Sequence, residues 1–125
     1  MKEGPITLVV LGVTGDLMAR KLSPALFSLF EKGKLPKNFN IVGFSRRDWD
    51  DQDLKAHIKS QLARYSPEAP VGKVSQFLNK LSYQHGDFAD PKSYQQLEQH
   101  LRKVEAARHA KTHRLFYLAV PPELY

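Results

Sequence analysis

The sequence contains no cysteine. Without thiols the chain has no disulfide scaffold, no cysteine nucleophile and no thiolate metal site. Long apolar runs are also missing, because none approaches the roughly 20 residues that a membrane-spanning helix needs. The apolar stretch after the N-terminus, residues 6–11, is too short for the core of a signal peptide. These absences predict a cytoplasmic protein that does not enter a membrane.

Recognisable catalytic groups are scarce as well. The histidines are scattered, and only His109 and His113 have the spacing of metal ligands. That pair lies in a basic stretch that we expect to be mobile, so we predict no metal site. The sequence shows no Ser-His-Asp arrangement and no pair of carboxylates suited to general acid–base catalysis.

What is present is the composition of a soluble globular domain. Hydrophobic residues make up 42% of the chain and charged residues 26%, which argues against disorder. A length of 125 residues suits one domain or part of one. The net charge of +6 suits a nucleic acid, an acidic membrane surface or a phosphorylated small molecule as partner. Composition alone does not choose among these three.

Apolar strands alternate with amphipathic segments along the chain. Strands are expected at residues 6–11, 41–44, 81–88 and 115–120. Helices are expected at residues 17–33, with a kink or restart at Pro24, at 51–65, at 71–81 and at 91–104. The order β-α-β-α-α-β-α-β predicts an α/β Rossmann-like parallel sheet with right-handed crossovers. A doubly wound sheet usually has more than four strands, so we expect residues 1–125 to be the N-terminal part of such a domain.

A turn of small residues follows the first strand, where dinucleotide-binding sheets hold the pyrophosphate. Its sequence is Gly12-Val13-Thr14-Gly15-Asp16-Leu17. Glycines let the backbone approach phosphates, and the following helix N-terminus supplies free N–H donors. Thr14 and Leu17 replace the second and third glycines of the standard G-x-G-x-x-G pattern, and no P-loop lysine follows. The alternative is a tight strand-to-helix turn without a ligand.

The second strand ends in Ser45-Arg46-Arg47, where NAD-binding domains usually carry an acid for the ribose 2′-hydroxyl. An acid would repel a 2′-phosphate, whereas a guanidinium binds its oxygens in a forked geometry. Arg46 is therefore predicted to bind the 2′-phosphate of NADP, and Arg47 to stack on or flank the adenine. The alternative is two solvated arginines that pair with the aspartates following them.

Weaker candidates lie near the same edge of the sheet. Asp87 and Phe88 would line the adenine side, unless they only form a turn. Val120 and Pro121 would face the cofactor crevice, unless they only begin a helix. Lys21 is within reach of a phosphate or a substrate, although most helix lysines are merely solvated.

A basic cluster precedes the fourth strand. It comprises Arg108, Lys111 and Arg114, with the two histidines named above. Because no aromatic residues are interleaved and no nucleic-acid motif is present, we predict a solvated loop rather than a nucleic-acid interface.

The run from Gly12 to Leu26 resembles the opening motif of glucose-6-phosphate dehydrogenases. That family reads G-x-x-G-D-L-x-x-[RK]-K-[LI]-x-P-[AST]-[LIVFM], and every fixed position is present here. The resemblance continues through residues 35–36, 41–46, 87 and 115–122, so it covers essentially the whole chain. It implies that the chain belongs to the NADP-binding domain of an enzyme of the pentose phosphate pathway. The reaction implied moves a hydride from C1 of glucose 6-phosphate to the nicotinamide and yields 6-phosphogluconolactone.

The resemblance also implies roles for single residues. The nucleotide turn would be formed by Gly12, Thr14, Gly15, Asp16 and Leu17. Arg46 would bind the 2′-phosphate, Asp87 and Phe88 would lie by the adenosine, and Lys21 would lie near the nicotinamide and the substrate. The family's catalytic histidine belongs to an Arg-Ile-Asp-His-Tyr-Leu-Gly-Lys-Glu motif that this chain lacks. We therefore expect the chain alone to be inactive. The resemblance also implies that the full-length enzyme is a homo-oligomer.

Three alternatives stay open at this point. The first is a non-catalytic module that binds NADP. The second is an extended short-chain reductase or epimerase, against which Met18 in place of a third glycine and the lack of Tyr-x-x-x-Lys both count. The third is a nucleic-acid-binding protein.

Overall fold

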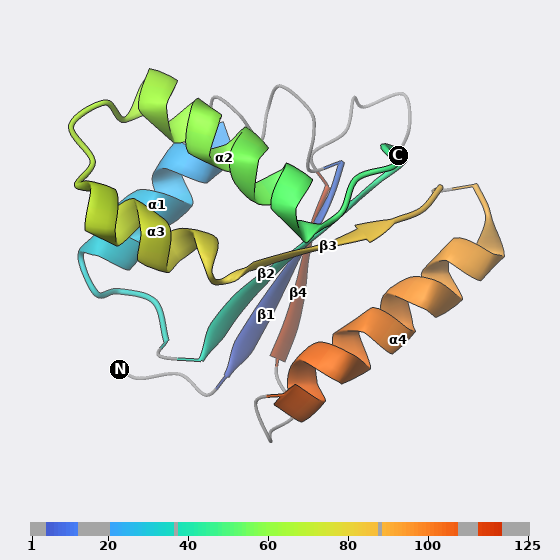
Figure 1. Ribbon diagram of the computed structural model, residues 1–125. Helices are drawn as coiled ribbons and strands as arrows, with labels where there is room; N and C mark the ends of the chain where they lie inside the picture. Colours follow the sequence, from blue (N-terminus) through green and yellow to red (C-terminus); the bar gives the residue numbers. More distant parts are fainter. Residues whose placement is uncertain (1–4, 13–20, 37, 88, 108–112, 119–125) are drawn as a thin grey trace.

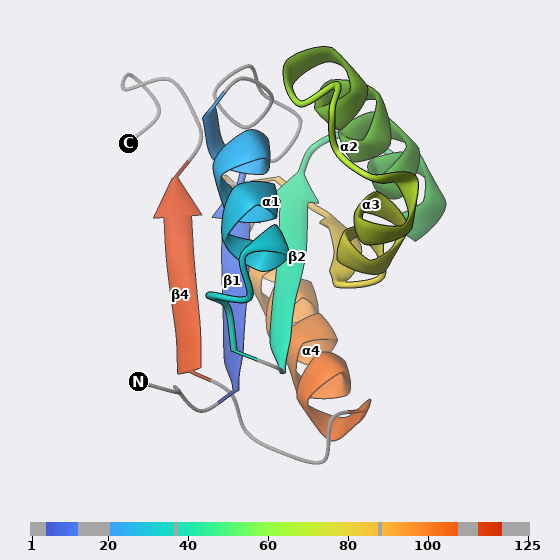
Figure 2. The same cartoon turned by 90° about the vertical axis from the view of Figure 1, so that its left-hand side faces the viewer.

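The computed structural model describes residues 5–12, 21–36, 38–87, 89–107 and 113–118. Its four strands form one parallel sheet in the order β3-β2-β1-β4. They are β1 (Ile6–Leu11), β2 (Phe39–Ser45), β3 (Leu81–His85) and β4 (His113–Leu118). One face is covered by α1 (Ser23–Glu31), α2 (Asp51–Tyr65) and α3 (Val71–Leu78), and the other by α4 (Pro91–Ala107) (Figures 1 and 2). The predicted α/β Rossmann-like arrangement is confirmed.

The sheet separates two hydrophobic cores, because alternate side chains of each strand point to opposite faces. On the side of α1, α2 and α3 the core includes Leu8, Val10, Ile41, Leu54, Ile58 and Phe77. On the side of α4 it consists of Val9, Leu11, Val42, Phe44, Leu97 and Leu101. The near-continuous apolar runs of β1 and β2 thus reflect burial on both faces.

Local signals set the helix ends. The Asp50 carboxylate accepts the Asp53 N–H at 2.9 Å and the Asp53 carboxylate accepts the Asp50 N–H at 3.0 Å, so Asp50 is the N-cap of α2. Pro24 lies in the first turn of α1, where a proline costs no intrahelical hydrogen bond. Gly33, with a φ of 69°, ends α1 as predicted.

Several predicted boundaries were wrong. Helix α3 ends at Leu78 rather than 81, and β3 ends at His85 rather than 88. Strand β4 begins at His113, two residues early, because the His113 N–H donates to the Pro5 carbonyl at 2.8 Å.

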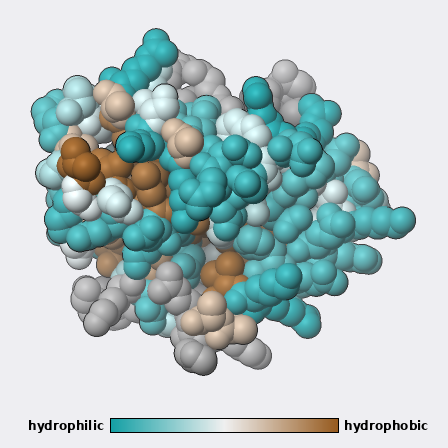
Figure 3. Space-filling view, viewed as in Figure 1, coloured by the Kyte–Doolittle hydropathy of each residue, from teal (hydrophilic) through white to brown (hydrophobic). Residues whose placement is uncertain are grey.

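The two sides of the molecule differ in surface character. Hydrophobic residues gather near α2 and α3, whereas the surface of α4 in this view is mostly hydrophilic (Figure 3). A groove of about 320 Å³ lies between the end of α2 and α3, lined by residues such as Leu62, Val71 and Leu78. None of the described helices is long and apolar enough to span a bilayer.

Candidate functional site

The candidate site lies at the carboxyl edge of the sheet. Because all four strands are parallel, their carboxyl ends meet at one edge (Figure 2). Gly12 follows β1, Arg46 and Arg47 follow β2, and Asp87 follows β3 by two residues. In doubly wound sheets the ligand crevice is at this edge. The fold therefore brings together candidate residues from three separate stretches of sequence.

Gly12 follows β1 in a left-handed backbone conformation. Its φ is 85°, a conformation that favours glycine because no Cβ is present to clash. Its N–H donates to the Phe44 carbonyl at 2.8 Å, so the turn begins against the neighbouring strand β2. This is the glycine conformation that the predicted turn requires at its first position. The other turn candidates, Val13, Thr14, Gly15, Asp16 and Leu17, lie outside the described residues.

Arg46 and Arg47 are both exposed at the end of β2. The Arg47 guanidinium lies over the Trp49 ring, 5.6 Å from its centroid. Neither arginine forms an ion pair with any residue in the described part of the chain, so the alternative of pairing with nearby aspartates is not observed there. The Arg46 guanidinium is thus available to an anionic ligand.

Residues of β3 and the residue after it contact the backbone of residues 45–47, which we call the arginine turn. The Tyr83 hydroxyl donates to the Arg47 carbonyl at 2.6 Å and lies 2.6 Å from the Ser45 hydroxyl. The His85 Nε2 lies 3.0 Å from the Arg46 carbonyl, and the Gly86 N–H donates to the Ser45 carbonyl at 2.8 Å. Burial raises the pKa of Tyr83, so the hydroxyl keeps its proton and remains a donor.

Three residues that shape this site were not predicted from the sequence, namely Ser45, Tyr83 and His85. A usable signal was the alternation of β3, because Tyr83 and His85 are two residues apart and share one face of the strand. The pairing of Ser45 with His85 in the sheet register could be found only from the structure.

A second set of contacts links the arginine turn to the start of α1. The Trp49 and His57 rings are 4.9 Å apart, and His57 Nε2 lies 2.6 Å from Gln61 Nε2. The Ser23 hydroxyl, fully buried at the start of α1, donates to Gln61 Oε1 at 3.2 Å. Burial, and then the charge of Arg47, lower the pKa of His57, which favours the neutral imidazole.

The remaining candidates divide between the site and local structure. Lys21 is exposed and lies two residues before α1. Asp87 is exposed, and its carboxylate accepts the Ala89 N–H at 2.9 Å. This contact is typical of a turn, which was the alternative prediction for Asp87. Phe88, Val120 and Pro121 lie outside the described residues.

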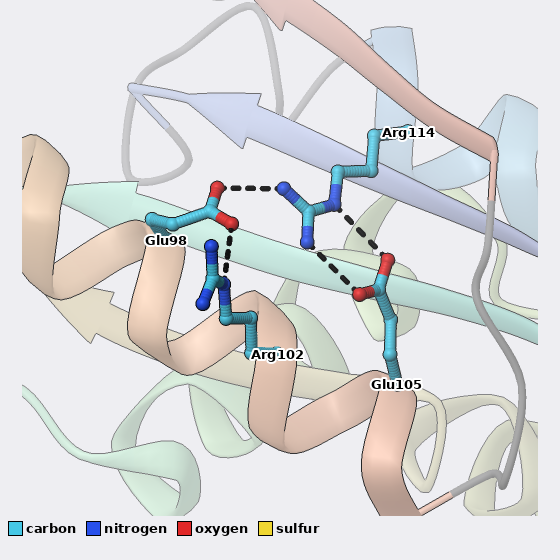
Figure 4. A network of polar contacts seen from close by, with 4 residues as sticks. All are labelled: Glu98, Arg102, Glu105 and Arg114. Atoms are coloured by element: carbon cyan, nitrogen blue, oxygen red, sulfur yellow. Dashed lines mark hydrogen bonds and ion pairs between the residues drawn. The ribbon is translucent and has the colours of Figure 1, made fainter.

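The basic cluster is not the solvated loop that the sequence predicted, as far as its described residues show. Arg114 lies within β4 and is only 25% exposed. Its guanidinium binds the carboxylates of Glu98 and Glu105 on α4 (Figure 4). His113 is an exposed residue of the same strand, whereas Arg108, His109 and Lys111 lie outside the described residues. Pairing with α4 explains the difference, since the two glutamates precede Arg114 by 9 and 16 residues and meet it only because α4 packs against the sheet.

The strand order 3-2-1-4, the positive-φ glycine after β1 and the arginine turn after β2 define a dinucleotide-binding domain of the Rossmann class. Over residues 9–125 the sequence matches the family described as "Glucose-6-phosphate dehydrogenase, NAD binding domain". The chain belongs to this family. The resemblance drawn from the opening motif is thereby confirmed.

Several relatives support this assignment. The chain is 36% identical over 128 residues to the chloroplastic glucose-6-phosphate 1-dehydrogenase of Spinacia oleracea, covering 100% of this chain and 22% of that protein. It is 37% identical over 120 residues to the enzyme of Schizosaccharomyces pombe, covering 94% and 24%. The chain thus spans about a quarter of the length of these curated relatives.

Solved structures agree with the fold. A glucose-6-phosphate dehydrogenase in complex with glucose 6-phosphate superimposes with a TM-score of 0.86 at 31% identity, over 99% of this chain and 26% of that one. The glucose-6-phosphate 1-dehydrogenase of Mycobacterium avium gives a TM-score of 0.81 at 24% identity, over 98% and 25%, and supports the fold alone.

Proposed function

We propose that this chain is the NADP-binding portion of a glucose-6-phosphate dehydrogenase, and that Arg46 selects NADP over NAD by binding the 2′-phosphate. The observation that carries the choice of NADP is the exposed Arg46 guanidinium, which forms no ion pair with the described residues around it. A guanidinium at the end of β2 is suited to a phosphate, whereas the usual NAD-binding acid is missing from that position.

The described residues fit a bound dinucleotide. The turn at Gly12 lets the backbone approach a pyrophosphate closely. Arg46 supplies a permanent positive charge for the 2′-phosphate, and Lys21 supplies an exposed ammonium shortly before α1. When bound, the cofactor accepts a hydride at its nicotinamide. The role of this chain's residues is to bind and orient it at the carboxyl edge of the sheet.

Family membership supports the wider activity. We propose that residues 1–125 are the N-terminal part of the cofactor domain of a cytoplasmic homo-oligomeric enzyme. That enzyme would oxidise glucose 6-phosphate to 6-phosphogluconolactone. The chain contains no match to the family's catalytic-histidine motif, so we expect the 125-residue chain to bind NADP without oxidising the sugar phosphate.

The experiment is a titration of the purified chain with NADP and with NAD, repeated with Arg46→Ala. Charge-assisted hydrogen bonds contribute about 1.5–3 kcal/mol, so the Kd for NADP should rise about 10- to 100-fold while that for NAD stays unchanged. Arg102→Ala is the matched control, because it removes an equal charge from an exposed position on α4. Equal binding of both nucleotides by the folded wild type, or an unchanged Kd in Arg46→Ala, would contradict the proposal.

A further inference from the structure

We infer that Tyr83 is a positioning residue for nucleotide selection, because its hydroxyl fixes the turn that presents Arg46 and Arg47. This inference rests on the proposed function and extends it to a residue of the neighbouring strand. Tyr83 itself is 5% exposed and is therefore placed to act through the turn rather than by touching the nucleotide.

The hydroxyl is held at the centre of a small polar cluster. It donates to the Arg47 carbonyl at 2.6 Å, lies 3.2 Å from the Ser45 carbonyl, and is 2.6 Å from the Ser45 hydroxyl. The Ser45 hydroxyl in turn accepts the Arg47 N–H at 3.3 Å. Both backbone polar groups of Arg47 are thus tied to the Ser45–Tyr83 pair.

The tyrosine that makes these contacts is itself anchored. The Tyr83 N–H donates to the Asp51 carboxylate at 2.7 Å, which ties β3 to the first turn of α2. Its ring lies 6.1 Å from that of Trp49, on which the Arg47 guanidinium rests. The hydroxyl therefore connects the arginine turn to a fixed part of the fold.

The Arg46 carbonyl has a hydrogen bond of its own with β3. It lies 3.0 Å from His85 Nε2, and His85 is two residues beyond Tyr83 on the same face. With both carbonyls tied to β3, the turn is ordered before a ligand arrives. Ordering a loop in advance reduces the entropy lost on binding, so an ordered turn raises the affinity of the arginines for a phosphate.

This geometry predicts a selective effect. Only NADP carries the 2′-phosphate proposed to meet Arg46, whereas both nucleotides carry the adenine proposed to meet Arg47, so loosening the turn should weaken NADP more than NAD. A residue needed merely for the stability of the fold would weaken both nucleotides together. The ratio of the two affinities therefore separates positioning from general support.

The test uses Tyr83→Phe, which removes the hydroxyl and keeps the buried ring. The Kd for NADP should rise about 3- to 10-fold, the size of one net hydrogen bond, with the Kd for NAD within about twofold of wild type. Tyr65→Phe is the matched control, since it removes a phenol hydroxyl from the far end of α2. In an Arg46→Ala background, the effect of Tyr83→Phe on the Kd for NADP should shrink to its effect on the Kd for NAD.

The outcomes are distinguishable. A folded wild type without preference for NADP would overturn the proposed function and the inference with it. A wild type that prefers NADP, combined with a Tyr83→Phe variant that weakens both nucleotides equally or keeps its effect in the Arg46→Ala background, would overturn the inference alone. Circular dichroism and thermal unfolding verify that each variant is folded. If Tyr83→Phe does not fold, Ser45→Ala removes the hydroxyl partner of Tyr83, and an unchanged preference in that variant overturns the inference.

Discussion

Two arginines at opposite edges of the sheet have opposite surroundings. Arg114, near the amino end of β4, donates to Glu98 at 2.6 Å and to Glu105 at 2.9 and 3.0 Å (Figure 4). Arg46, beyond the carboxyl end of β2, is exposed and has no ion pair with the described residues. The charge of Arg114 is paired within the fold, whereas the charge of Arg46 lies at the edge where Rossmann sheets bind ligands.

The difference shows why counting basic residues does not locate a binding site. The carboxylates, Glu105 foremost, raise the pKa of Arg114 above its ordinary value, which marks a charge already satisfied within the structure. What is fixed around Arg46 is its backbone, whereas its charge is left unsatisfied by the described side chains. An anion-binding arginine needs this combination of an ordered backbone and an available guanidinium.

Among the variants that test this comparison, Arg114→Ala is expected to have the largest effect on the free energy of unfolding. Removing the guanidinium leaves Glu105, whose side chain is 13% exposed, without its forked partner. Losing this forked pair should lower the free energy of unfolding by about 2 kcal/mol. Chemical denaturation measures this loss. Arg114→Lys, which keeps the charge but not the fork, should lose less, and the preference between NADP and NAD should not change.

A loss below about 0.5 kcal/mol for Arg114→Ala, the size typical of exposed positions, would show that the two arginines differ less than their contacts indicate. A changed nucleotide preference would show that Arg114 influences the opposite edge of the sheet.

Acid should erase part of the difference between wild type and Arg114→Ala. Hydrogen bonds from Arg102, and then from Arg114, lower the pKa of Glu98 below its ordinary value of 4.5. A carboxyl whose pKa is lowered by folding stabilises the fold above its ordinary pKa, and this contribution is lost as the pH falls through the lowered value. Unfolding measured from neutral pH to below 4.5 should show a constant difference that shrinks only in the acid range. A difference that shrinks already near neutral pH would point to another group.

The smallest effect is expected for Arg102→Ala. Arg102 pairs with Glu98 at 2.9 Å across one helical turn, but its side chain is 75% exposed. Exposed pairs at this spacing contribute about 0.3–0.5 kcal/mol, so the variant should unfold at nearly the wild-type denaturant concentration. A loss as large as that of Arg114→Ala would mean that the whole network, rather than the half-buried fork, carries the stability.

Much of the fold followed from local patterns. The apolar run of β1, the Asp50 cap with Asp53, Pro24 and Gly33 each act over a few residues, so sequence alone places these elements. The boundaries of β3 and β4 were less accurate. Contacts with distant segments, such as the bond between His113 and Pro5, set where those strands start and stop.

The sequence by itself determined the class of the protein, because the glycine turn, the arginines after the second strand and the alternation of strands and helices are all local patterns. Only the tertiary structure decided what surrounds each charge. Tyr83 and Arg47 are 36 residues apart and meet because β2 and β3 are neighbours, and Arg114 meets Glu98 across 16 residues because α4 packs against the sheet. Such pairings depend on how strands and helices lie beside one another, which no short stretch of sequence encodes.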